Sequence, residues 1–200
     1  SLSCDLAGNS LSDLNGNIFI DSLLYNQDGK SLALDRLRLV SLASDHHQLM
    51  RLSSNLVNVS LITTYDLADV PKALLNLVYT YCGNLFAERK TATEFHYCDE
   101  IDHSLSLKVD AYNLAPILDM FVPNIHVDNN TTLSVKTNES HSDDQIQFFS
   151  PGIRVGDNLI VNNAQISSYQ EDVKNLGINA SVRSVVIGEK GNFSFENIDL

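Results

Sequence analysis

Six side chains that could bind a metal ion gather in one short stretch of the sequence. They are His96, Cys98, Asp99, Glu100, Asp102 and His103. If residues 94–98 form a strand, His96 and Cys98 project from one face, and Asp102 or His103 could complete a zinc site from the following turn. The spacing matches no zinc motif, and an acidic turn between two strands accounts for the same residues. We therefore expect no metal site, and the sequence favours a metal-dependent hydrolase built on His96, Cys98, Asp102 and His103 least of the alternatives.

Other signatures of catalysis are missing from the sequence. It has no G-x-S-x-G, G-x-G-x-x-G or P-loop phrase, and its paired carboxylates fall in predicted turns, where spacing alone assigns them no acid–base role. The cysteines Cys4, Cys82 and Cys98 have no C-x-x-C spacing, which argues against a zinc knuckle or a disulfide scaffold. The sequence thus predicts a protein that is not an enzyme and that binds no cofactor.

The charge balance argues against one class of partner. With 13 Lys and Arg against 25 Asp and Glu, the formal net charge is −12, whereas a nucleic-acid site needs clustered cations. We therefore expect no nucleic-acid partner. The 200 residues are 44% hydrophobic, which is enough for a substantial core. No apolar run approaches the roughly 20 residues that cross a bilayer.

One phrase occurs twice and indicates the elements that organise the chain. Tyr-Asp-Leu-Ala at residues 65–68 is echoed by Tyr-Asn-Leu-Ala at residues 112–115. Each phrase follows a segment with the period of two that is typical of a half-covered strand, and each opens a segment with helical spacing of apolar residues. Pro71 and Pro116 fall in the first turn of these helices, where proline is tolerated. The amphipathic stripes predict helices that lie flat on a sheet.

Most of the remaining chain alternates between apolar and polar residues as short strands do. Asp28-Gly29 predicts a hairpin turn, and a slip in the alternation at Asp35-Arg36 predicts a β-bulge within residues 31–40. We expect a mainly β fold with two short amphipathic helices, in which an antiparallel meander forms a curved sheet that is either an open trough or a sandwich. Residues 1–200 are expected to be one elongated segment of a longer protein, with 1–98 and 99–200 each holding one strand-to-helix unit.

The order and spacing of several phrases resemble the TamB/AsmA-like family of Gram-negative envelope proteins, particularly the long TamB homologues of the Bacteroidetes. The resemblance spans roughly residues 10 to 165. The phrases that carry it are Leu-Asn-Gly-Asn-Ile at 14–18, Leu-Ala-Leu-Asp at 32–35, Met-Arg-Leu-Ser-Ser at 50–54 before Leu-Ile-Thr-Thr-Tyr-Asp-Leu at 61–67, and Leu-Ser-Leu-Lys-Val at 105–109 before Tyr-Asn-Leu-Ala-Pro at 112–116. The family's N-terminal membrane helix and characteristic C-terminal region are not in this sequence, which fits an internal segment.

The resemblance implies a periplasmic protein anchored in the inner membrane, with a long β-sheet trough that lets phospholipids pass to the outer membrane. It also implies a role in outer-membrane assembly with an outer-membrane barrel partner, and it brings no catalytic residues. The acyl chains of phospholipids would lie against inward strand residues. The positions that we expect to line this interior are Ile18, Ile20, Leu32, Leu34, Val57, Val59, Leu61, Leu105, Leu107, Val109, Leu133, Val135, Leu159 and Val161.

The residues alone leave two alternatives open. The same positions would form a closed core if the sheet folded over itself as a sandwich, and the two helices could plug the trough. A surface or adhesin-type β module that binds protein or carbohydrate through its polar loops is the second functional hypothesis.

Overall fold

The computed structural model describes the chain except for residues 11–12, 28, 45–46, 83–101, 173–174, 189–192 and 200. Its strands are β1 (Leu2–Ala7), β2 (Asn15–Ile20), β3 (Leu23–Gln27), β4 (Lys30–Leu34), β5 (Leu37–Ala43), β6 (Gln48–Ser54), β7 (Val57–Thr63), β8 (Ser104–Ala111), β9 (Ile125–Val127), β10 (Thr131–Asn138), β11 (Gln145–Val155), β12 (Leu159–Asp172), β13 (Asn175–Ile187) and β14 (Phe193–Asp199). The helices are α1 (Val70–Cys82) and α2 (Ala115–Phe121).

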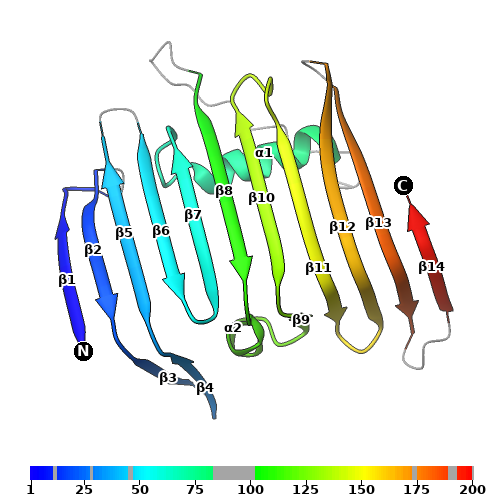
Figure 1. Ribbon diagram of the computed structural model, residues 1–200, viewed down its shortest axis with the longest axis horizontal. Coiled ribbons are helices and arrows are strands. Elements are labelled where there is room, and N and C mark those ends of the chain that lie inside the picture. Colours follow the sequence, from blue (N-terminus) through cyan, green and yellow to red (C-terminus); the bar gives the residue numbers. More distant parts are fainter. Residues whose placement is uncertain are drawn as a thin grey trace.

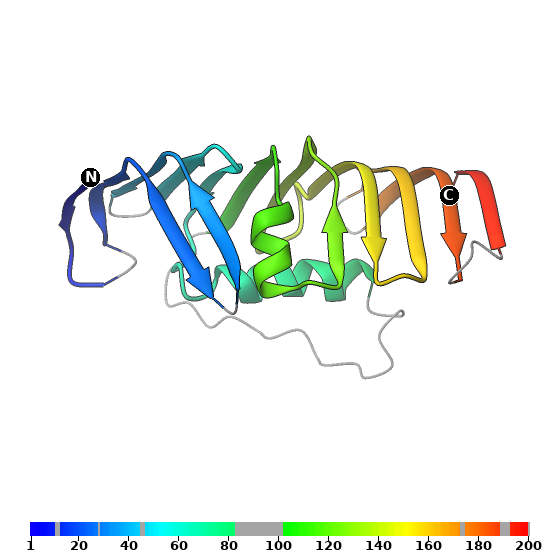
Figure 2. The same ribbon diagram turned by 90° about the horizontal axis from the view of Figure 1, so that it is seen from below.

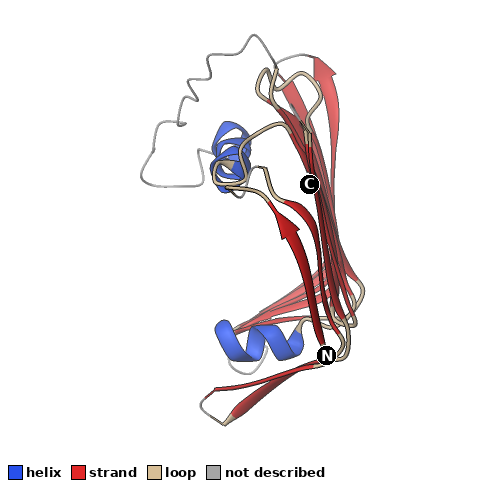
Figure 3. Cartoon of the chain, turned by 90° about the vertical axis from the view of Figure 1, so that its left-hand side faces the viewer, coloured by secondary structure: helices blue, strands red, loops and turns tan. Residues whose placement is uncertain are grey.

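Twelve strands form one antiparallel sheet in the order β1-β2-β5-β6-β7-β8-β10-β11-β12-β13-β14, with β9 paired to β11 (Figure 1). The strands β3 and β4 form a separate hairpin. Within the described residues, β1 and β14 each pair with a single neighbour, so the sheet is open at both ends. The sheet is a single curved layer, and both helices lie on its inner side (Figure 3). The expected antiparallel, mainly β fold with two short helices is confirmed.

The helix α1 runs across the strands along the length of the sheet (Figure 2). Its residues Val70 and Ala73 form a buried cluster with Tyr65 and Leu105, and Leu61, Leu67, Leu74 and Leu107 pack against this cluster. Leu105 is only 1% exposed. The helix predicted after the first copy of the repeated phrase therefore lies flat on the sheet, and its apolar face covers β7 and β8.

A second cluster lies at the opposite ends of the strands, under α2. Leu32 and Leu34 from β4 are buried with Leu56, and Ile117 and Met120 of α2 pack against them. The Nζ atom of Lys30 also donates a hydrogen bond to the backbone oxygen of Asp119 in α2. The β3–β4 hairpin and α2 therefore bury each other's apolar residues at this end of the sheet.

The β-bulge predicted at Asp35-Arg36 is wrong. The strand β4 ends at Leu34, and β5 starts at Leu37 in the main sheet, so the slip marks a change of sheet and not an extra residue within one strand. The hairpin predicted at Asp28-Gly29 joins β3 to β4, and Gly29 has a φ of 78°, which favours glycine; Asp28 lies outside the described residues.

The two expected halves of the chain share this sheet, because β7 pairs with β8 along residues 57–63 and 105–111. None of the helices in the described part of the chain has the length and apolar content needed to span a membrane.

The buried Leu105 provides a test of how α1 is held. Replacing Leu105 with Ala should lower the free energy of unfolding by about 3 kcal/mol, because removing a fully buried side chain leaves a cavity. Urea denaturation followed by circular dichroism measures the change. Leu42→Ala is the matched control, since Leu42 is 55% exposed on β5 and its loss should change stability little. Equal effects of the two variants would contradict this packing.

Candidate apolar trough

One row of apolar side chains crosses the inner face of the sheet. In an antiparallel pair, residues directly opposite each other point to the same face. The register therefore joins one residue from each of nine adjacent strands into what we call the central row: Ile18, Leu39, Leu52, Val59, Val109, Leu133, Phe148, Ile166 and Ala180. All nine are half-buried, so each side chain of the row keeps part of its surface exposed to solvent.

The central row is long compared with an acyl chain. Eight strand spacings of about 4.8 Å give a row of roughly 38 Å. The hydrocarbon core of a bilayer is about 30 Å thick, so the acyl chains of one leaflet span about 15 Å. The row could therefore hold more than one acyl chain end to end.

The two helices flank the central row and do not cover it along its whole length. On one side, the neighbouring row contains Leu61 and Leu107, which pack against the cluster under α1. On the other side, Val57 pairs with Ala111 next to the buried Leu56 under α2. The central row is thus an apolar strip that runs across the strands between the two helix clusters, and we call this strip the candidate furrow.

The structure distributes the expected interior residues among several places. Ile18, Val59, Val109 and Leu133 belong to the central row, and Leu61, Leu107 and Val135 form the row beside it on the α1 side. Leu105 is buried beneath α1, whereas Ile20 and Val57 lie in the row on the α2 side. Leu32 and Leu34 belong to the separate hairpin and are buried against α2.

Leu159 and Val161 lie in two further rows. Leu159 pairs with Val155 on β11 and Ile187 on β13, and Val161 pairs with Ile153 and Val185 on the same strands. Along β12 both are separated from Ile166 of the central row by a stretch that includes Asn163, whose φ is 51°. Neither row is therefore a continuation of the central row.

Five members of the central row were not among the expected interior residues: Leu39, Leu52, Phe148, Ile166 and Ala180. Leu52 and Phe148 keep the period of two with Met50 and Ile146, which is the signal that could have identified them. Alternation does not tell which residue of the next strand lies opposite, so the continuous row could not be assembled from the sequence.

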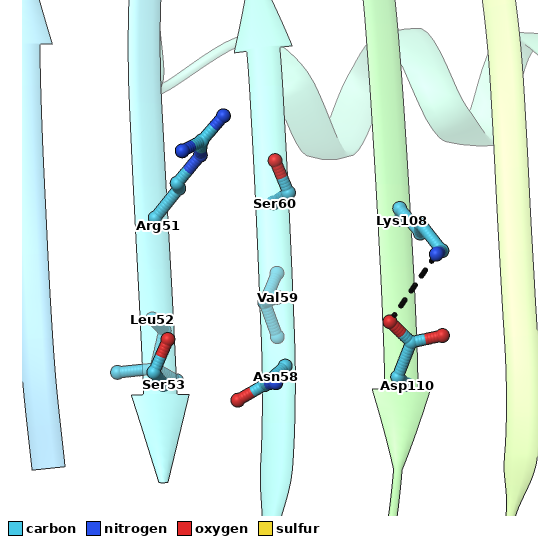
Figure 4. A pocket seen from close by; sticks show the side chains of 8 residues that line it. All are labelled: Arg51, Leu52, Ser53, Asn58, Val59, Ser60, Lys108 and Asp110. Carbon is cyan, nitrogen blue, oxygen red and sulfur yellow. Dashed lines mark ion pairs between the residues drawn. The ribbon is translucent and has the colours of Figure 1, made fainter.

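The outer face of the same strands is polar. Figure 4 shows Arg51, Ser60 and Lys108 in front of the strands and Val59 behind them. The Nζ atom of Lys108 lies 3.4 Å from a carboxylate oxygen of Asp110. The sheet therefore separates an apolar inner face from a hydrated outer face.

Polar side chains are buried where β7, β8, β10 and β11 meet the α1 side of the sheet. Asp144 is fully buried; its carboxylate accepts a hydrogen bond from the Thr137 hydroxyl at 2.6 Å and pairs with His141 Nδ1 at 2.7 Å. The hydrogen bond to Asp144 raises the pKa of His141, although burial of the ring opposes it. Burial also raises the pKa of the Tyr65 phenol, and the charges of Glu139, Asp102 and Asp144 add to this effect.

Most of the metal ligands considered from the sequence, namely His96, Cys98, Asp99 and Glu100, lie outside the described residues. Asp102 accepts hydrogen bonds from Asn138 and Ser140 in the turn between β10 and β11. His103 is buried, with Nδ1 3.0 Å from the Thr64 backbone oxygen and its ring 5.3 Å from that of Tyr65. In the described part of the chain, no group of three or more His, Cys, Asp or Glu residues could hold a metal ion.

No family model matches the chain, and no curated protein or solved structure matches it either.

The His141–Asp144 pair predicts a pH dependence of stability. A histidine whose pKa is raised on folding stabilises the protein fully below its unfolded pKa of about 6.5, and this contribution is lost as the pH rises through the folded pKa. The wild-type chain should therefore lose stability relative to His141→Gln as the pH rises above about 6.5. Urea midpoints across this pH range measure the difference.

His126→Gln is the control for loss of a histidine, because the His126 side chain is 40% exposed and lies 3.5 Å from Asp128, which is also exposed. If His141→Gln and wild type showed parallel profiles, the pair would contribute nothing to stability.

Proposed function

We propose that this chain is a non-enzymatic internal segment of a periplasmic TamB-like protein whose parent is anchored in the inner membrane. In this proposal the trough carries the acyl chains of phospholipids between the inner and outer membranes and so contributes to outer-membrane assembly. The parent chain would act with an outer-membrane barrel protein. The observation that supports the proposal best is the half-buried central row on the inner face of an open sheet.

The chemistry of the central row suits an acyl chain. Each methylene group that leaves water contributes about 0.8 kcal/mol, and the row offers Val, Leu, Ile and Phe side chains for this contact. The phosphate-bearing headgroup would stay in water beyond the rim of the trough, because burying a charge without a partner is costly.

The uniformity of the row suits movement as well as binding. A ligand held by directional hydrogen bonds must break them to move, whereas apolar contact is non-directional. Successive strands present apolar side chains of similar chemistry, so an acyl chain could shift by one strand spacing with little change in contact. A trough of this kind needs no cofactor and no catalytic group.

Site-specific crosslinking tests where lipid binds. A photoreactive amino acid placed at Val59 or Leu107 should become linked to phospholipid in cells, because Val59 lies in the central row and Leu107 in the row beside it. The matched control is Ile62, an apolar residue of the same strand that is 43% exposed on the outer face. Mass spectrometry of the purified chain identifies the linked species. Absence of phospholipid at residues 59 and 107, or equal labelling at residue 62, would count against the trough.

A charge placed in the central row should block it. Leu133→Glu should reduce the phospholipid that co-purifies with the chain by about fivefold or more, because a carboxylate keeps its water and interrupts the apolar floor. The amount is measured as lipid phosphorus per chain.

Ser134→Glu is the matched control, since Ser134 is the next residue of β10 and lies opposite Lys108 on the outer face. Circular dichroism verifies that both variants fold. Equal phospholipid content in the two variants would contradict the proposal, and absence of lipid from the wild-type chain would favour the adhesin-type alternative.

A further inference from the structure

The outer face carries a hollow that has no part in the proposed trough. It lies over β7 and has a volume of about 300 Å³. The hollow forms because β7 presents the short side chains of Asn58 and Ser60 outward, whereas the neighbouring strands present the longer Arg51 and Lys108 in the same row. Two cationic side chains therefore stand on opposite sides of a shallow polar depression (Figure 4).

The placement of these cations contrasts with the charge of the whole chain. The chain has a net charge of −12, so a negatively charged ligand is repelled by most of its surface. Around the hollow the balance is reversed, because Arg51 and Lys108 face one carboxylate, that of Asp110. Arg38 adds a third cation beside it, opposite Ser53, where a second hollow of about 510 Å³ begins.

The side chains leave room for a ligand between them. Figure 4 shows the Arg51 side chain reaching from β6 into the space between β6 and β7, and the Lys108 side chain turned toward Asp110. Lys108 is 63% exposed, and its ammonium lies 3.4 Å from Asp110, which is a long and weakly held ion pair at the surface. The backbones of β6 and β8 are two strand spacings apart, about 9.5 Å, which two long side chains can bridge through a small anion.

We propose that this outer hollow binds a phosphate-sized oxyanion between Arg51 and Lys108. The Arg51 guanidinium provides paired donors that match two oxygens of the anion. The Lys108 ammonium leaves its ion pair with Asp110 and pairs with the anion instead. The hydroxyl of Ser60, which lies between the two cations on β7, donates a third hydrogen bond. The ligand is a phosphate group, either free or as part of an exposed ester such as a lipid headgroup. This site does not depend on the trough, because it lies on the opposite face of the sheet.

Titration with inorganic phosphate at low ionic strength tests the site. Two-dimensional NMR of the labelled chain should show shifts of the amides near residues 51, 60 and 108, and potassium chloride at matched ionic strength should not produce them. Arg51→Ala and Lys108→Ala should each weaken the affinity by about tenfold, the effect of losing one charge-assisted hydrogen bond. Lys136→Ala is the matched control, since Lys136 is an exposed outer-face lysine of β10 that pairs with Asp143.

A gain of binding provides an independent measurement. Asp110→Asn frees Lys108 and removes the negative charge, so it should tighten phosphate binding by about threefold. Vesicles of phosphatidylglycerol and of phosphatidylcholine then distinguish the two sources of the phosphate. Binding of phosphatidylglycerol vesicles that is lost in Arg51→Ala supports a headgroup, and binding of free phosphate alone supports a soluble ligand. If neither binds, or if Arg51→Ala and Lys136→Ala bind alike, the proposal is overturned.

Discussion

The whole arrangement depends on a single constraint, which is that one layer of antiparallel strands must have two faces of opposite polarity. Every strand points alternate side chains to the inner and outer sides. A sandwich would bury the apolar side against a second sheet, whereas the elements on the inner side of the main sheet in the described part of the chain are α1, α2 and one hairpin. These elements bury Leu105 and Leu34 at two margins and leave the central row half-buried between them.

The same constraint keeps the two candidate sites apart. Val59 and Ser60 are consecutive residues, yet one contributes to an apolar furrow and the other to a polar hollow (Figure 4). The backbone of the sheet, whose groups are occupied by ladder hydrogen bonds, lies between them. A ligand on one face therefore has no direct contact with a ligand on the other, and each site can be altered by substitutions that leave its counterpart intact.

The sequence predicted the local elements better than their assembly. The repeated phrase located both helices because its signals, a proline in the first turn and an apolar stripe, act within a few residues. The slip at Asp35-Arg36 was misinterpreted because a bulge and a change of sheet interrupt the alternation in the same way. Leu32 and Leu34 were expected in the trough but are buried against α2, because an alternation with period two indicates that one face of a strand is covered and does not indicate which element covers it. The partners of Asp144 were also not predicted, because its contacts with Thr137 and His141 depend on the turn between β10 and β11.

The strict pairing of these strands restricts how the chain can change in length. Removing one residue between Val59 and Leu61 would turn every later side chain of β7 to the opposite face, so that apolar side chains would face water and hydroxyl groups would face the furrow. Losing two residues would preserve the sidedness and shorten the strand. Over evolutionary time, strand segments should therefore tolerate insertions and deletions in even numbers, whereas exposed connections between strands can vary by one residue. In such a sheet, whether the number of residues in a strand segment changes by an even or an odd number would matter more than which residues it contains.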